Sequence, residues 1–167
     1  MSRENAPTSD KLFVGPIKIA PVPPSADELQ RASASGARLG SAFALEAYRV
    51  DDTSRAGESL NVTLYWKSIA KTDKNYTIFV HLLDSSGKIR AQVDSQPRGG
   101  AYSTSIWDAG EMIRDDYALP LPRDLAAGEY RIEIGAYEYP SLTRLAVSDA
   151  SGKALGDHLN LANVTVQ

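Results

Sequence analysis

From Ala42 onward, apolar residues recur at every second position in short runs, and each run ends at a turn signal. The clearest run is residues 59–70. Its apolar face carries Leu60, Val62, Leu64 and Trp66. A period of two places alternate side chains on opposite faces of a β-strand, so this run predicts a strand with one buried face and with Trp66 in the core. Nothing after residue 42 repeats with the helical period, which argues against a parallel α/β sheet.

Further runs of strand composition follow the same pattern. They are residues 42–50, 76–84, 88–95, 111–122, 129–139, 142–147 and 158–166. The second is almost continuously apolar, as a central strand is, and Ser85-Ser86-Gly87 predicts a hairpin from it into the third. The sequence therefore predicts an all-β, immunoglobulin-like antiparallel β-sandwich of about seven to eight strands, with one short N-terminal helix.

Residues 1–40 are predicted to form a lead-in, and residues 41–167 the sandwich domain. The lead-in starts with polar residues that we expect to be disordered. Residues 12–20 then form a β-rich run, but Gly15-Pro16 interrupts it. Because proline cannot donate to a strand ladder, this run is expected to be an edge or bulged strand.

A capping box predicts the one helix of the lead-in. Ser25 stands three residues before Glu28, the arrangement in which each side chain caps the other residue's backbone. We expect the helix to extend to about Ala34 and residues 33–40 to link it to the sandwich.

Composition excludes several classes of function. With 43% hydrophobic and 23% charged residues in 167, the chain is an ordinary globular protein. It has no cysteine, which removes thiol catalysis, disulfides and cysteine-ligated metals. The net charge is −3 and the basic residues are scattered, so no nucleic-acid partner is expected. No oligomeric state is indicated.

The sequence also lacks the hydrophobic segments of membrane proteins. No apolar run is long enough to span a bilayer, and the first residues lack the apolar middle of a secretory signal. We expect no direct membrane insertion of this chain. If the domain works outside the membrane, its signal or anchor is expected on a part of the protein beyond this sequence.

Two histidines are the first candidates for chemistry. His81 lies within the apolar run 76–84, where a buried histidine hydrogen-bonded to a neighbour is expected rather than a base or a ligand. His158 is far away in the sequence. Two isolated histidines do not make a metal site, which needs three or four convergent ligands, so no metal and no cofactor are expected.

The carboxylates form no recognisable catalytic pair. Asp115 and Asp116 are adjacent in a predicted strand, so their side chains should point to opposite faces. A calcium site is a further alternative, because oxygen ligands from Asp51, Asp52, Asp84 or Asp94 could converge, although no known calcium-loop spacing is present. Phosphate-loop and nucleophile-elbow motifs are absent, and a hydrolase would need two carboxyls facing each other across a cleft. We therefore predict that the chain is not an enzyme.

The most informative stretch is the long glycine-rich connection 94–107. Its candidate ligand-binding residues are Asp94, Gln96, Arg98, Tyr102, Thr104 and Trp107. Sugars have apolar ring faces and polar edges, so aromatic rings beside charged hydrogen-bonding groups would suit them. In the alternative, which we favour, Tyr102 and Trp107 plug the end of the sandwich.

Four motifs carry a resemblance to a known family. They are Leu64-Tyr65-Trp66, Phe79 to Asp84, Asp94 to Tyr102, and Leu125 to Tyr130, where Ala126-Ala127 replaces a usual proline. From about Leu39 to Leu161, the chain resembles the β-sandwich module of bacterial polytopic membrane glycosyltransferases of the dolichyl-phosphate-mannose mannosyltransferase type.

The resemblance implies a non-catalytic, extracytoplasmic accessory domain beside a cell-envelope glycosyltransferase. It supplies no catalytic residues. The expected partner is a glycan or a neighbouring domain of the membrane protein. A structural or protein-interaction sandwich without a small-molecule ligand stays open as the alternative.

Overall fold

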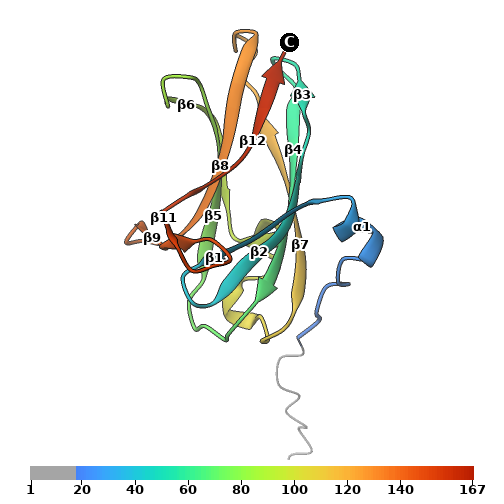
Figure 1. The fold of residues 1–167 in the computed structure, drawn as a ribbon, viewed down its shortest axis with the longest axis vertical. Helices are drawn as coiled ribbons and strands as arrows, with labels where there is room; N and C mark the ends of the chain where they lie inside the picture. Colours follow the sequence, from blue (N-terminus) through green and yellow to red (C-terminus); the bar gives the residue numbers. More distant parts are fainter. Residues whose placement is uncertain (1–17) are drawn as a thin grey trace, which may run out of the picture.

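A computed structural model describes residues 18–167, and it consists of two β-sheets packed face to face (Figure 1). Sheet A runs in the order β11 (Ala154–Gly156), β10 (Val147–Ser148), β1 (Ser33–Leu39), β2 (Phe43–Val50), β4 (Ser59–Ser68), β7 (Met112–Pro120). Sheet B runs in the order β3 (Thr53–Ser54), β12 (Leu159–Val166), β8 (Gly128–Glu138), β5 (Tyr76–Leu83), β6 (Ile89–Ser95), and β9 (Thr143–Arg144) also pairs with β8.

The predicted all-β sandwich is confirmed. Of the twelve described strands, eight have seven or more residues, and the other four are short pieces of two or three. All described pairings are antiparallel except β3 with β12. The immunoglobulin-like assignment stays a prediction. The predicted disordered start, and most of the edge strand at residues 12–20, lie outside the described residues.

The core confirms the predicted strand phase. Trp66 and the three apolar residues that alternate before it are fully buried between the sheets. Facing them from sheet B are Ile78, Val80 and Leu82 of β5 and Ile132, Ile134 and Ala136 of β8. β5 lies between β8 and β6, so its prediction as a central strand is also confirmed.

The capping box forms as predicted. The Glu28 backbone N–H donates to Ser25 Oγ at 3.2 Å, and the Ser25 backbone N–H donates to Glu28 Oε2 at 2.8 Å. The helix α1 (Ala26–Gln30) is shorter than predicted, because Arg31 already forms its C-cap. Arg114 of β7 donates to Glu28 Oε1 at 2.6 Å and joins the helix to sheet A.

The predicted linker at residues 33–40 is wrong. Most of it is β1, which pairs with β2 on one side and β10 on the other, so the sandwich starts at Ser33 rather than near residue 41. The strand carries small residues and a register shift between Ala34 and Ala37, where Gly36 has φ +72°. This irregularity removes the alternation that marks the other strands.

The single strand predicted at residues 142–147 is a second correction. The segment divides into β9, which pairs with β8 of sheet B, and β10, which pairs with β1 of sheet A. It therefore crosses from one sheet to the other. Within residues 18–167, no helix has both the length and the apolar character required to cross a bilayer.

Candidate functional site

The connection between β6 and β7 buries three of the six predicted ligand-binding residues. Tyr102, Thr104 and Trp107 are 3%, 1% and 2% exposed. The Trp107 ring packs edge-on against Phe43 at 5.7 Å, and its Nε1–H donates to the Tyr102 carbonyl at 3.0 Å. Both aromatic rings therefore lie inside the protein, as in the favoured alternative that Tyr102 and Trp107 plug the end of the sandwich.

Buried hydrogen bonds hold this connection against the end of the sandwich. Thr104 Oγ1 donates to the Lys74 carbonyl at 2.6 Å and accepts from the Tyr76 backbone N–H at 3.0 Å. The Tyr102 hydroxyl donates to Glu111 Oε1 at 2.7 Å. Two large aromatic side chains gain more from burial than from exposure, so they plug the core instead of facing a ligand.

The other three predicted residues, Asp94, Gln96 and Arg98, each hydrogen-bond to a different residue of the protein. Asp94 accepts from the Tyr137 hydroxyl at 3.0 Å, and Gln96 Oε1 accepts from the Ser103 hydroxyl at 2.7 Å. Arg98 has φ +57°, and its guanidinium donates to the Arg114 carbonyl at 3.2 Å. Asp94 lies in β6 and bonds to β8, whereas the contacts of Gln96 and Arg98 are those of a folded loop.

A buried carboxylate fixes the start of this loop. Asp115 is 1% exposed and accepts from the Arg98 backbone N–H at 2.7 Å, the Trp66 indole at 3.1 Å and the Tyr117 hydroxyl at 2.7 Å. Burial raises the pKa of the Asp115 carboxyl above its ordinary range, and burial also raises the pKa of Tyr117. Asp116 points to the opposite, exposed face, as predicted.

The outer face of sheet B holds a polar network that sequence reasoning missed. Glu133 of β8 faces both histidines: Oε1 lies 3.2 Å from His81 Nδ1, and Oε2 lies 3.8 Å from His158 Nε2. His158 Nδ1 is 2.9 Å from Asp157 Oδ1, and His81 Nε2 is 3.8 Å from Asp94 Oδ1. The cross-strand register of His81 with Glu133 creates the contact, and no sequence motif signals it.

The centre of this network is closed to ligands. His81 and Glu133 are 5% and 7% exposed, so the expectation of a buried, hydrogen-bonded His81 is confirmed. The Phe79 ring stacks on His81 at 4.5 Å, and the Arg144 guanidinium lies 4.4 Å from the Phe79 ring centre. In the part of the chain that the structure describes, no three histidine, aspartate or glutamate side chains are placed to hold a metal ion.

Gly135 provides the space for this stack, which gives a first testable prediction. A Cβ atom at Gly135 would lie 2.3 Å from Phe79 Cζ and 2.9 Å from the Asp157 carbonyl oxygen. We expect Gly135→Ala to lower the free energy of unfolding by about 1–3 kcal/mol, as overpacking does. Chemical denaturation checks this, and an unchanged midpoint would show that the ring and the backbone yield freely.

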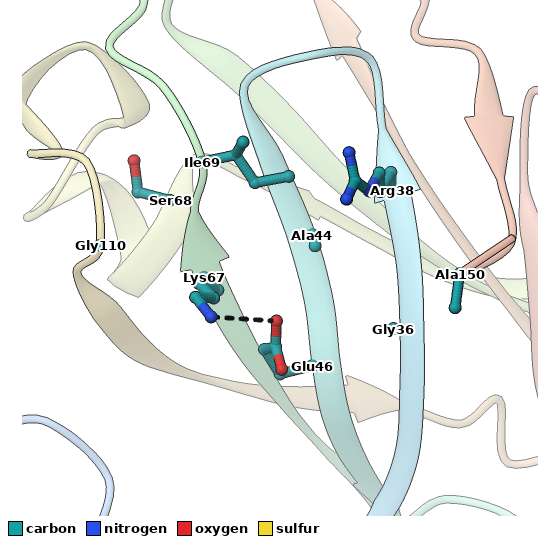
Figure 2. A pocket seen from close by; sticks show the side chains of 9 residues that line it. All are labelled: Gly36, Arg38, Ala44, Glu46, Lys67, Ser68, Ile69, Gly110 and Ala150. Atoms are coloured by element: carbon teal, nitrogen blue, oxygen red, sulfur yellow. Dashed lines mark ion pairs between the residues drawn. The ribbon is translucent and has the colours of Figure 1, made fainter. Parts of the chain in front are cut away.

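An open groove of about 370 Å³ lies on the outer face of sheet A (Figure 2). Its centre is a cross-strand row in register: Arg38 of β1 pairs with Ala44 of β2, which pairs with Lys67 of β4. Directly opposed residues point to the same face, so two long cationic side chains stand on either side of one methyl group. The space above Ala44, between the Arg38 and Lys67 side chains, is the centre of the groove.

The rest of the groove wall mixes apolar and charged groups. Ile69 is 37% exposed, and Ala150 closes the side next to β1. Glu46 Oε1 lies 3.9 Å from Lys67 Nζ, a distance too long for a hydrogen bond. Of the carboxylates in residues 18–167, Glu46 alone lines the groove, whereas a glycoside hydrolase needs two that face each other.

Sequence reasoning did not find this groove. Arg38 and Lys67 are far apart in the chain, and neither belongs to a motif. Arg38 also lies in the segment predicted as a linker. Only the pairing of β1 with β2 brings the row together.

Comparison with known proteins gives fold neighbours alone. No family model and no curated protein matches the sequence. The C-terminal domain of Wzt is similar in structure, with a TM-score of 0.54, 11% identity, and coverage of 78% of this chain and 77% of that one. A β-glucosidase from Listeria innocua in complex with glucose matches with a TM-score of 0.44, 18% identity, and coverage of 74% and 16%.

Proposed function

We propose that this chain is a non-catalytic accessory module that binds carbohydrate, in an extracytoplasmic setting beside a cell-envelope glycosyltransferase. The groove on sheet A, not the 94–107 connection, is its binding surface. The observation that carries the proposal is the in-register row of Arg38, Ala44 and Lys67 on an open sheet face. The link to a glycosyltransferase rests on the sequence resemblance.

The groove has the chemistry that a sugar requires. Ile69 at the rim offers apolar contact to a ring face, and the small, 5% exposed Ala44 at the floor leaves space above it. The flanking side chains offer hydrogen bonds to ring substituents. A groove that is open along the sheet also accommodates a chain longer than one sugar. The side chains project from regular strands, which hold them in place without the ligand.

Filling the groove is expected to weaken binding. Phenylalanine at position 44 would occupy the space between Arg38 and Lys67, so Ala44→Phe should lower the affinity for the bound glycan at least about tenfold. A panel of neutral and acidic polysaccharides identifies the ligand by affinity electrophoresis, and titration calorimetry then compares the variants.

Ala118→Phe is the control for the added ring. Ala118 is exposed on β7, on the same sheet, and does not line the groove. It should bind like the parent chain. Equal binding by both variants would move the site elsewhere, and binding to no member of the panel would contradict the proposed function.

One observation favours the structural alternative. The turn between β8 and β9 exposes two large apolar side chains, Tyr139 at 72% and Leu142 at 61%. Exposed apolar groups of this size within one turn are typical of protein contacts. This alternative predicts that no polysaccharide of the panel binds.

A further inference from the structure

We propose that the groove selects glycans that carry anionic substituents, uronic carboxylates or phosphodiesters, and that Arg38 and Lys67 hold the anion. This inference rests on the proposed function and names its ligand class. The following observations on the two cations and on their spacing support it.

Neither Arg38 nor Lys67 is held in a strong ion pair within the described residues, so both can bind an anion from outside the protein. Arg38 is exposed and takes part in no ion pair with another residue of 18–167. Within the described residues, the one ion pair of Lys67 is the loose contact with Glu46 at 3.9 Å, and both of those side chains are well exposed, at 48% and 39%. Such a solvated pair contributes little, so an anionic ligand could displace it at small cost.

The charge of the groove is opposite to that of the chain. Its charged lining residues are Arg38, Lys67 and Glu46, that is, two positive and one negative, which gives +1. The whole chain carries −3. The hydroxyls of a neutral glycan accept ordinary hydrogen bonds from the two cations, whereas a carboxylate or phosphate accepts stronger, charge-assisted ones.

The spacing of the row fits an oligosaccharide better than a small ion. β1 and β4 are separated by β2, so Arg38 and Lys67 arise from backbones about 10 Å apart, twice the usual strand spacing. Ala44 between them leaves room for a ring. The planar Arg38 guanidinium can engage a carboxylate or phosphate with two parallel hydrogen bonds, and the Lys67 ammonium acts as a point charge.

Calorimetric titration with matched ligands tests the inference. The probes are oligogalacturonate, its neutral methyl ester on the same backbone, and poly(glycerol phosphate) as the phosphodiester source. At least one anionic probe should bind about tenfold or more tightly than the methyl ester, and raising the salt from low to high concentration should weaken that binding alone.

Variants that remove one positive charge show whether the groove binds the anionic probe. Arg38→Gln and Lys67→Gln should each weaken binding of the anionic probe about tenfold, without change in the thermal midpoint. Arg49→Gln is the control, because Arg49 is an exposed cation on β2 that does not line the groove. It should bind as the parent chain does.

The outcomes separate the two proposals. Equal binding of the ester and the acid, with both groove variants unaffected, would overturn the anionic ligand and leave glycan binding intact. If no probe binds but a neutral polysaccharide of the panel does, the anionic ligand is likewise overturned and glycan binding stands. Failure of every probe and of the whole panel would overturn both.

Discussion

Replacing Trp107 with alanine is expected to lower the free energy of unfolding by about 3–5 kcal/mol. The Trp107 side chain is 2% exposed and packs against Phe43, which in turn contacts the Trp66 ring at 5.4 Å. Its removal leaves a cavity at the end of the core and an unpaired Tyr102 carbonyl. Urea denaturation, followed by far-ultraviolet circular dichroism, measures the loss.

The neighbouring Ile106 supplies the control. Its side chain is 43% exposed, so Ile106→Ala should change stability by no more than about 0.5 kcal/mol. Similar small losses in both variants would mean that the connection between β6 and β7 is not a plug of the core. Its aromatic residues would then be free to contact a ligand, as the ligand-binding interpretation of residues 94–107 holds.

The second large effect is expected at Asp115. In Asp115→Ala, the Arg98 backbone N–H, the Trp66 indole and the Tyr117 hydroxyl all lose their acceptor. Because a buried donor without a partner costs about 1–3 kcal/mol, the variant should lose about 3–5 kcal/mol, some donors regaining water. Asp116→Ala on the exposed face is the control and should lose far less.

The pH dependence of a milder variant reports the burial of the same carboxyl. Desolvation raises the pKa of folded Asp115 above its ordinary value of 3.8, so between the two pKa values the folded chain binds more protons than the unfolded chain. Stability contributed by this group is therefore greatest below pH 4 and is lost as the pH rises through that window.

Asp115→Asn cannot titrate, so the stability difference between the parent chain and this variant isolates the effect. The stability advantage of the parent chain should be largest below about pH 4 and should shrink as the pH is raised toward neutrality. The other carboxyls titrate in both chains, so their effects cancel in the difference. A difference that grows with pH would show that hydrogen bonds to the carboxylate outweigh its desolvation.

The elements that sequence predicted best are those that local chemistry determines. The alternation that ends at Trp66 fixed the face of β4, because a slip of one residue would expose that whole apolar set. Ser25 and Glu28 likewise determined where α1 begins, since their capping contacts span three residues. Neither inference needed a contact between distant parts of the chain.

The features that sequence missed depend on pairing between distant segments. β1 has small residues and an irregular register, and it is a strand because β2 and β10 supply its partners. The groove arises from that same pairing, and the convergence of His81 and His158 on Glu133 arises from the packing of sheet B. A motif cannot encode such contacts when the residues are ordinary ones.

The most direct test of the glycan-binding account is amide chemical-shift mapping of the isotope-labelled chain during titration with the tightest glycan of the panel. The account predicts that the perturbed amides cluster on β1, β2 and β4 around Arg38, Ala44 and Lys67. Perturbations centred on the 94–107 connection or on sheet B, with this row unchanged, would contradict it.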